Sequence, residues 1–168
     1  MTVTTDDISV ETFISLSVLL TGIAQEQLAP DLDAHNLSQV YYDYAMARDP
    51  ADFTQLLQIY SDNQDKEPAV IADIIFNQSG EAVCFIARST MLMWYLGSWY
   101  SPAALQAYQP AIPAPPPPPS NVISPGAYTQ GWAWNVAQAH PMGYSNFRFG
   151  YWNGNPPPLS AFVGGNGA

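Results

Sequence analysis

The sequence predicts an all-α fold: a small helical bundle, followed by a proline-rich strut and an irregular aromatic C-terminal segment. Three observations predict it. Apolar residues recur at helical spacing through the first hundred positions, Pro and Gly punctuate that pattern where helices begin and end, and residues 110–119 contain seven prolines. We therefore expect a helical bundle domain over residues 1–109, a polyproline linker over 110–120, and a partner-binding segment over 121–168. At 168 residues the chain is long enough to bury one core.

The helices are expected in chain order from this spacing and from capping residues. Ser9 is placed as an N-cap, and Gly22 stands where a helix can end in a left-handed residue. Asp49-Pro50 and Ser101-Pro102 each predict a cap followed by the first helical position. The expected helices are about Ser9–Thr21, Leu37–Met46, one from Pro50 through Tyr60, Pro68 to about Asn77, the apolar stretch Ala82–Tyr100, a short turn Pro102–Tyr108, and Trp132–Ala139 as a further candidate.

The apolar stretch Ala82–Tyr100 divides the chain into two unlike halves. It carries one charge, Arg88, in nineteen residues, and all fourteen acidic residues precede it. An Arg near the middle of a membrane span is costly, and no Lys or Arg cluster flanks the stretch to orient it. We therefore expect a buried core helix and no direct membrane span, with a membrane-associated adaptor as the alternative.

Charge and cysteine content exclude several classes of protein. A net charge of −10 argues against nonspecific nucleic-acid binding, which needs clustered Lys and Arg. The single Cys84 allows no internal disulfide. The first ten residues lack the basic and apolar regions of a signal peptide.

Candidates for chemistry are few. His35 and His140 have no neighbouring ligand at metal-site spacing, and a Cys84–His140 nucleophile pair is less expected than an inert core cysteine. Asp31 and Asp33 are explained by capping and solvation. We expect no catalytic, cofactor-binding or metal-binding residue; a small enzyme using Cys84 and His140 is the rival hypothesis.

The aromatic residues predict a protein-binding surface. Beyond the prolines, a segment broken by Pro and Gly carries many rings and one charge, Arg148, so the rings must either fold back on the bundle or cover a partner. The expected interface residues are Trp94, Tyr95, Trp99, Tyr100, Trp132, Trp134, His140, Met142, Tyr144, Phe147, Arg148, Phe149, Tyr151 and Trp152.

Two motifs resemble a known family. T-F-I-S-L-S-V-L-L-T-G at Thr12–Gly22 and M-W-Y-L-G at Met93–Gly97 are similar to the small subunit of membrane-bound FAD-dependent sugar and alcohol dehydrogenases, which include sorbitol, fructose and glucose dehydrogenase complexes. The resemblance covers about residues 12–100. It implies a noncatalytic accessory subunit: FAD lies in a large subunit of the glucose–methanol–choline (GMC) type, and haem in a separate cytochrome c subunit.

The resemblance also implies that the chain helps the large subunit mature and reach the periplasm. Two departures bear on this. The twin-arginine signal typical of these small subunits is not present in this sequence, which leaves a cytoplasmic location open, and His140-Pro141 stands where some members have Cys-Pro. A stand-alone helical binding protein is the alternative function.

Overall fold

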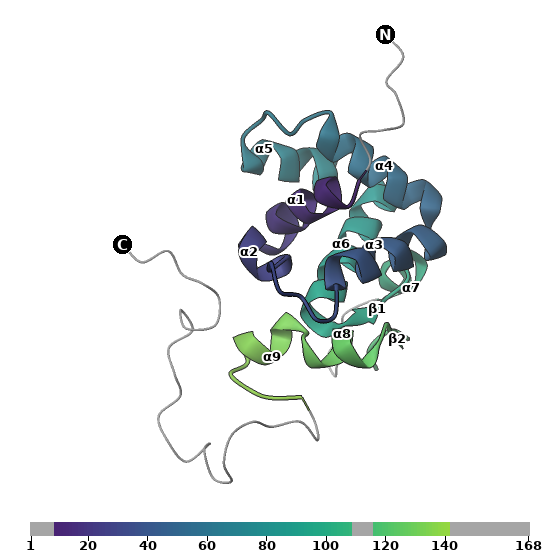
Figure 1. The fold of residues 1–168 in the computed structure, drawn as a ribbon. Coiled ribbons are helices and arrows are strands. Elements are labelled where there is room, and N and C mark those ends of the chain that lie inside the picture. The colour runs from purple at the N-terminus through teal and green to yellow at the C-terminus, as the bar shows by residue number, and fades with distance from the viewer. Residues whose placement is uncertain (1–8, 109–115, 142–168) are drawn as a thin grey trace.

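The computed structural model describes residues 9–108 and 116–141, and within them the all-α prediction is confirmed (Figure 1). The other helices pack around α6, the longest at 16 residues, and one pair of two-residue strands within the described residues lies at the C-terminal end of α6. The elements are α1 Val10–Thr21, α2 Gln25–Leu28, α3 Leu37–Arg48, α4 Pro50–Ser61, α5 Pro68–Asp73 with its π-helical continuation η2 Ile74–Gln78, α6 Glu81–Leu96, β1 Ser98–Trp99, α7 Pro102–Ala107, β2 Asn121–Val122, α8 Pro125–Thr129 and α9 Trp132–Val136.

Local signals set several helix ends as expected. The Ser9 hydroxyl accepts a hydrogen bond from the Thr12 amide at 3.3 Å, and Gly22 ends α1 with φ 71°. Ser101 caps α7 by accepting from the Ala104 amide at 3.2 Å. Asp49, by contrast, makes no side-chain capping bond at α4.

The apolar stretch is shorter as a helix than the sequence suggests. Gly97 adopts φ 61° and ends α6 at Leu96, so the prediction of helix through Tyr100 is wrong at its C-terminal end. Ser98 and Trp99 form β1 instead. A left-handed glycine cannot continue a right-handed helix, and this one turns the chain into the strand pair.

The core is built on α6 and contains a cluster of aromatic rings. Phe13 of α1 lies 5.7 Å from Phe53 of α4 and stacks on Trp94 at 6.0 Å, measured between ring centroids. Tyr41 of α3 meets Trp94 edge-on at 4.8 Å. All four residues are buried. Rings at these separations contribute specific packing beyond the area they bury.

Residues 121–136 return to the bundle. Val122 of β2 pairs with Ser98 of β1 in an antiparallel register, and α8 and α9 lie against the C-terminal end of α6 (Figure 1). Ala127 of α8 is completely buried in the common core. Of the two alternatives for the segment beyond the prolines, folding back on the bundle or covering a partner, residues 121–136 take the first.

The charged residue of the apolar helix lies at the surface. Arg88 is exposed, with its guanidinium 5.0 Å from the Phe85 ring centroid. The 16-residue α6 buries one face in the bundle through residues such as Ile86 and Met93. Among the described helices, none combines the length and apolar character that crossing a bilayer requires.

Candidate partner-binding surface

The short helix α9 separates two hollows on the surface of the protein. Trp132 lines one hollow and Trp134 lines the other. Residues two positions apart on a helix project roughly 200° apart, so the two rings lie on opposite sides of α9. The two tryptophans can consequently be tested independently.

Glycines bring this segment close to the bundle. A Cβ on Gly97 would lie 2.2 Å from the Ala127 carbonyl oxygen, and one on Gly131 would lie 2.9 Å from the Tyr95 carbonyl oxygen. At Gly126 a Cβ would lie 2.7 Å from Nδ1 of His35. The backbone of the α8–α9 segment therefore contacts α6 at distances that only glycine permits, whereas Gly126 meets the exposed side chain of His35.

The hollow lined by Trp134 is apolar and has a volume of about 330 Å³. None of its seven lining residues carries a charge: Tyr95, Leu96, Tyr100, Tyr128, Ala133, Trp134 and Ala137. The Trp134 Nε1 donates to the Tyr128 carbonyl at 2.8 Å, and the Tyr95 hydroxyl donates to the Thr21 carbonyl at 2.9 Å. Because these polar atoms bond within the chain, what the hollow offers a partner is mainly ring and methyl surface.

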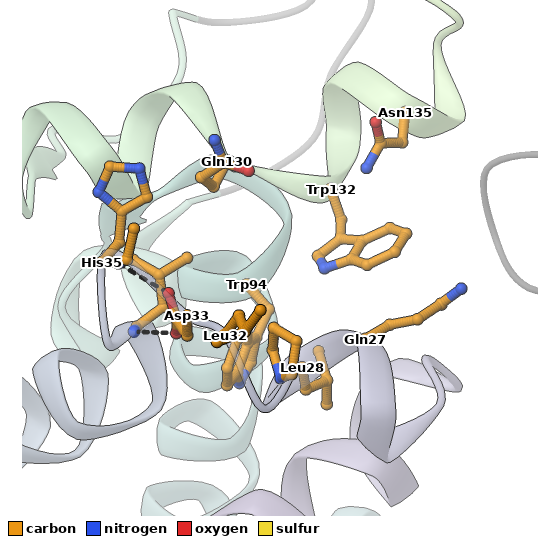
Figure 2. A pocket seen from close by; sticks show the side chains of 12 residues that line it. Gln27, Leu28, Leu32, Asp33, His35, Trp94, Gln130, Trp132 and Asn135 are labelled. Atoms are coloured by element: carbon orange, nitrogen blue, oxygen red, sulfur yellow. Dashed lines mark hydrogen bonds between the residues drawn. The ribbon is translucent and has the colours of Figure 1, made fainter.

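The hollow lined by Trp132 is polar and has a volume of about 310 Å³. In Figure 2, Trp132 reaches from α9 towards Gln27 and Leu28 of α2, and Gln130 and Asn135 lie along the same opening. Leu32 at its rim is 96 % exposed. No Lys or Arg is among the described residues that line it, and Asp33 is the single acidic residue among them.

Asp33 has a structural role beside this hollow. One carboxylate oxygen accepts from the His35 amide and the other from the Leu37 amide, each at 2.8 Å (Figure 2). Asp33 thus pairs the free amide of Leu37, the first residue of α3, although the N-cap position itself is Asn36, whose side chain makes no capping bond. The same carboxylate, together with burial, raises the pKa of the Tyr41 hydroxyl well above its ordinary value, with burial as the larger cause.

The structure divides the predicted interface residues that it describes into three groups. Trp94 and Trp99 are only 2 % and 4 % exposed, so their assignment to the interface is corrected: they hold the chain's own core together. Tyr95, Tyr100 and Trp134 meet at the apolar hollow, and Trp132 lines the polar one. His140 is half-buried, with Nδ1 2.9 Å from the Pro141 carbonyl oxygen.

The remaining predicted interface residues lie outside the described part of the chain. They are Met142, Tyr144, Phe147, Arg148, Phe149, Tyr151 and Trp152.

Residues considered for chemistry are not gathered into a metal site. Over residues 9–108 and 116–141, no three His, Cys, Asp or Glu side chains form a group that could hold a metal ion. Cys84 is a half-buried free thiol on α6.

Sequence reasoning missed the amides Gln27, Gln130 and Asn135 of the polar hollow. No motif distinguishes them, because they come from separate elements. It also missed α8, although Ser124-Pro125 repeats the cap-and-proline signal of Ser101-Pro102 and its Ser124 hydroxyl accepts from the Ala127 amide at 3.0 Å.

The two segments that carry the family resemblance are neighbours in space. Phe13 stacks on Trp94, and Tyr95 bonds Thr21, so Thr12–Gly22 and Met93–Gly97 stabilise each other. The last residue of the second motif, Gly97, has to be a glycine, because its φ is positive and an added Cβ would collide with the Ala127 carbonyl oxygen. No family model, curated protein or solved structure matches this chain.

Proposed function

We propose that this chain is a noncatalytic accessory subunit that binds and stabilises a large FAD-dependent GMC-type sugar or alcohol dehydrogenase subunit. The flavin belongs to the partner, and this chain carries no cofactor of its own. In the proposed complex it assists maturation of the large subunit and its delivery to the periplasm, where a cytochrome c subunit completes the assembly.

The apolar hollow beside α9 is the observation that supports this proposal most directly. Its rim combines Tyr95, Tyr100 and Trp134, uncharged residues from two separate parts of the sequence. Interfaces are enriched in such residues, and a few of them contribute most of the affinity. The family resemblance, which rests on Thr12–Gly22 and Met93–Gly97, supplies the class of partner.

Coexpression with a large GMC-type flavoprotein subunit tests the proposal. Ala137→Arg places a charge at the apolar hollow without removing a ring, and we expect it to reduce copurification of the flavoprotein by size-exclusion chromatography at least about tenfold. Val136→Arg is the matched control, because Val136 is 45 % exposed on α9 and lines neither hollow.

The outcomes separate the alternatives. If the wild-type chain does not elute with the flavoprotein, the accessory-subunit proposal is wrong and a stand-alone binding protein is favoured. If both variants retain the flavoprotein equally, the subunit proposal stands and the docking surface lies elsewhere. Redox turnover by the isolated chain would overturn the noncatalytic assignment.

A further inference from the structure

The outward face of α6 carries a third hollow, which α6 forms together with α7. Phe85, Arg88 and Leu92 recur at intervals of three and four residues, so they lie on one face of α6, opposite the buried Thr90. We call this hollow the α6–α7 groove; its apolar and aromatic lining residues are Phe85, Met91, Leu92, Leu105 and Tyr108, and its other lining residues are Arg88 and Gln106. Its volume of about 470 Å³ exceeds that of either hollow beside α9.

The apolar walls of the α6–α7 groove are only partly covered by the protein itself. Phe85, Met91 and Leu92 of α6 and Leu105 of α7 are all half-buried. A hydrocarbon chain lying in the groove would remove more of their surface from water, and burial of apolar surface is the main favourable term in association. The walls therefore suit an apolar chain.

One unpaired positive charge stands in this apolar lining. Arg88 is exposed, its guanidinium lies 5.0 Å from the Phe85 ring centroid, and no carboxylate of the described residues forms an ion pair with it. Glu81, two turns earlier on α6, instead accepts a hydrogen bond from Nε2 of Gln106 at 2.7 Å. The Arg88 guanidinium is thus left for an external anion, and a carboxylate is the anion whose two oxygens match its paired N–H groups.

The size of the groove favours a small ligand over a protein. The stretch of α6 from Phe85 to Leu92 is roughly 10 Å long at a rise of about 1.5 Å per residue. A stable protein interface covers about 800 Å² on each partner, which a groove of this length does not offer on its own. Its volume of about 470 Å³ falls within the range of small-molecule sites.

We propose that the α6–α7 groove binds a medium-chain carboxylic acid. The hydrocarbon chain lies against Phe85, Leu92 and Leu105, and the carboxylate, which is ionised at pH 7, pairs with the Arg88 guanidinium. The inference is independent of the proposed flavoprotein partner, because the groove shares no lining residue with the apolar hollow beside α9.

A two-dimensional NMR titration of the full-length chain at pH 7 tests this site. Hexanoate, octanoate and decanoate are the probes, and 1-octanol and octyltrimethylammonium replace the head group of octanoate. We expect saturable shifts of amide signals in α6 and α7, with affinity rising about two- to fourfold for each added methylene. Octanoate should bind at least about threefold more tightly than either head-group control.

Two arginines provide a matched pair of variants. Arg88→Gln should weaken octanoate binding at least about threefold and leave 1-octanol binding within about twofold. Arg48→Gln is the control: Arg48 is also exposed, with its guanidinium 5.0 Å from the Tyr44 ring centroid, but it does not line the groove. It should leave the binding of both ligands within about twofold.

The exposed Gln106 allows the charge of the groove to be changed without disturbing the core. Gln106→Glu should weaken octanoate binding, because it adds a carboxylate to the lining, whereas Gln106→Lys should retain or strengthen it. Far-UV circular dichroism checks the fold of each variant.

Several results would overturn the proposal. They are the absence of saturable shifts in α6 and α7, an affinity that does not depend on chain length, and equal octanoate binding by Arg88→Gln and Arg48→Gln. Arg88-dependent binding to phosphatidylglycerol vesicles without binding of free octanoate would also overturn it, in favour of contact with a lipid surface. None of these results bears on copurification of the flavoprotein, which tests the other proposal.

Discussion

At the residue scale, Tyr41 shows how tightly the aromatic core is closed. It is completely buried, meets Trp94 edge-on at 4.8 Å, and its hydroxyl has no hydrogen-bond partner among the residues that the structure describes. Its ring therefore stabilises the core while its hydroxyl opposes burial. Burial, helped by the charge of Asp33, raises its pKa.

Tyr41→Phe should raise the free energy of unfolding by about 1 kcal/mol at pH 7, since it deletes an unpaired buried group and keeps the ring. Urea denaturation followed by circular dichroism measures this. A loss of stability instead would show that the hydroxyl has a partner.

The pH dependence of the same residue has a definite sign. The pKa of Tyr41 in the folded protein lies above the ordinary value of 10.0. The stability that the neutral hydroxyl contributes is therefore fully present below about pH 10. It is lost as the pH rises further, because the hydroxyl ionises more readily in the unfolded chain. The wild type should lose stability above about pH 10 more steeply than Tyr41→Phe. Thermal melts of both proteins across that range provide the comparison.

Two left-handed glycines give a matched pair of substitutions. A Cβ added to Gly22, at φ 71°, would meet no atom within 4 Å, whereas at Gly97, with φ 61°, it would lie 2.2 Å from the Ala127 oxygen. Gly22→Ala should cost about 1–2 kcal/mol from backbone strain alone. Gly97→Ala should cost at least about 3 kcal/mol, because the backbone of α8 must also move. Equal losses in chemical denaturation would contradict the close contact.

At the scale of elements, α8 depends on its N-cap. Ser124→Ala removes the bond to the Ala127 amide and should destabilise the protein by about 1 kcal/mol. Ser101→Ala at α7 offers the comparison, since its capping bond is of the same type. An unchanged melting temperature in Ser124→Ala would mean that α8 is held by tertiary contacts alone.

Elements with strong local signals were predictable from the sequence. Ser9, Gly22 and Ser101 fix helix ends through their own neighbours, and Phe13 and Leu16 reach the core because they lie on one helix face. The sequence left open whether residues 121–136 fold back on the bundle or cover a partner, because their return depends on a two-residue strand pair and on glycine contacts between distant positions. Both hollows beside α9 form only because residues 121–136 pack against the bundle. The sequence could therefore predict which aromatic residues contribute to a binding surface, but not how they are placed around the hollows.

At the scale of the whole molecule, the fold extends past the proline-rich segment. Deleting residues 110–168 would remove β2, α8 and α9 and uncover the end of α6, so we expect the melting temperature to fall by about 10 °C or more. Deleting residues 142–168 removes no element of the described fold, and we expect a shift below about 3 °C. Differential scanning calorimetry distinguishes the two truncations. A chain lacking residues 110–168 that melts like the full-length protein would contradict the integration of α8 and α9.

The pairing of Ser98 with Val122 also bears on how the protein emerges from the ribosome. Synthesis proceeds from the N-terminus, so helices α1 to α6 leave the exit tunnel well before the strand and helices that cover the end of α6. During that interval the aromatic end of α6 is open to whatever is nearby, including a chaperone or a binding partner. The nascent chain thus exposes an apolar surface that the finished protein covers, and slowing translation across the proline codons would lengthen its exposure.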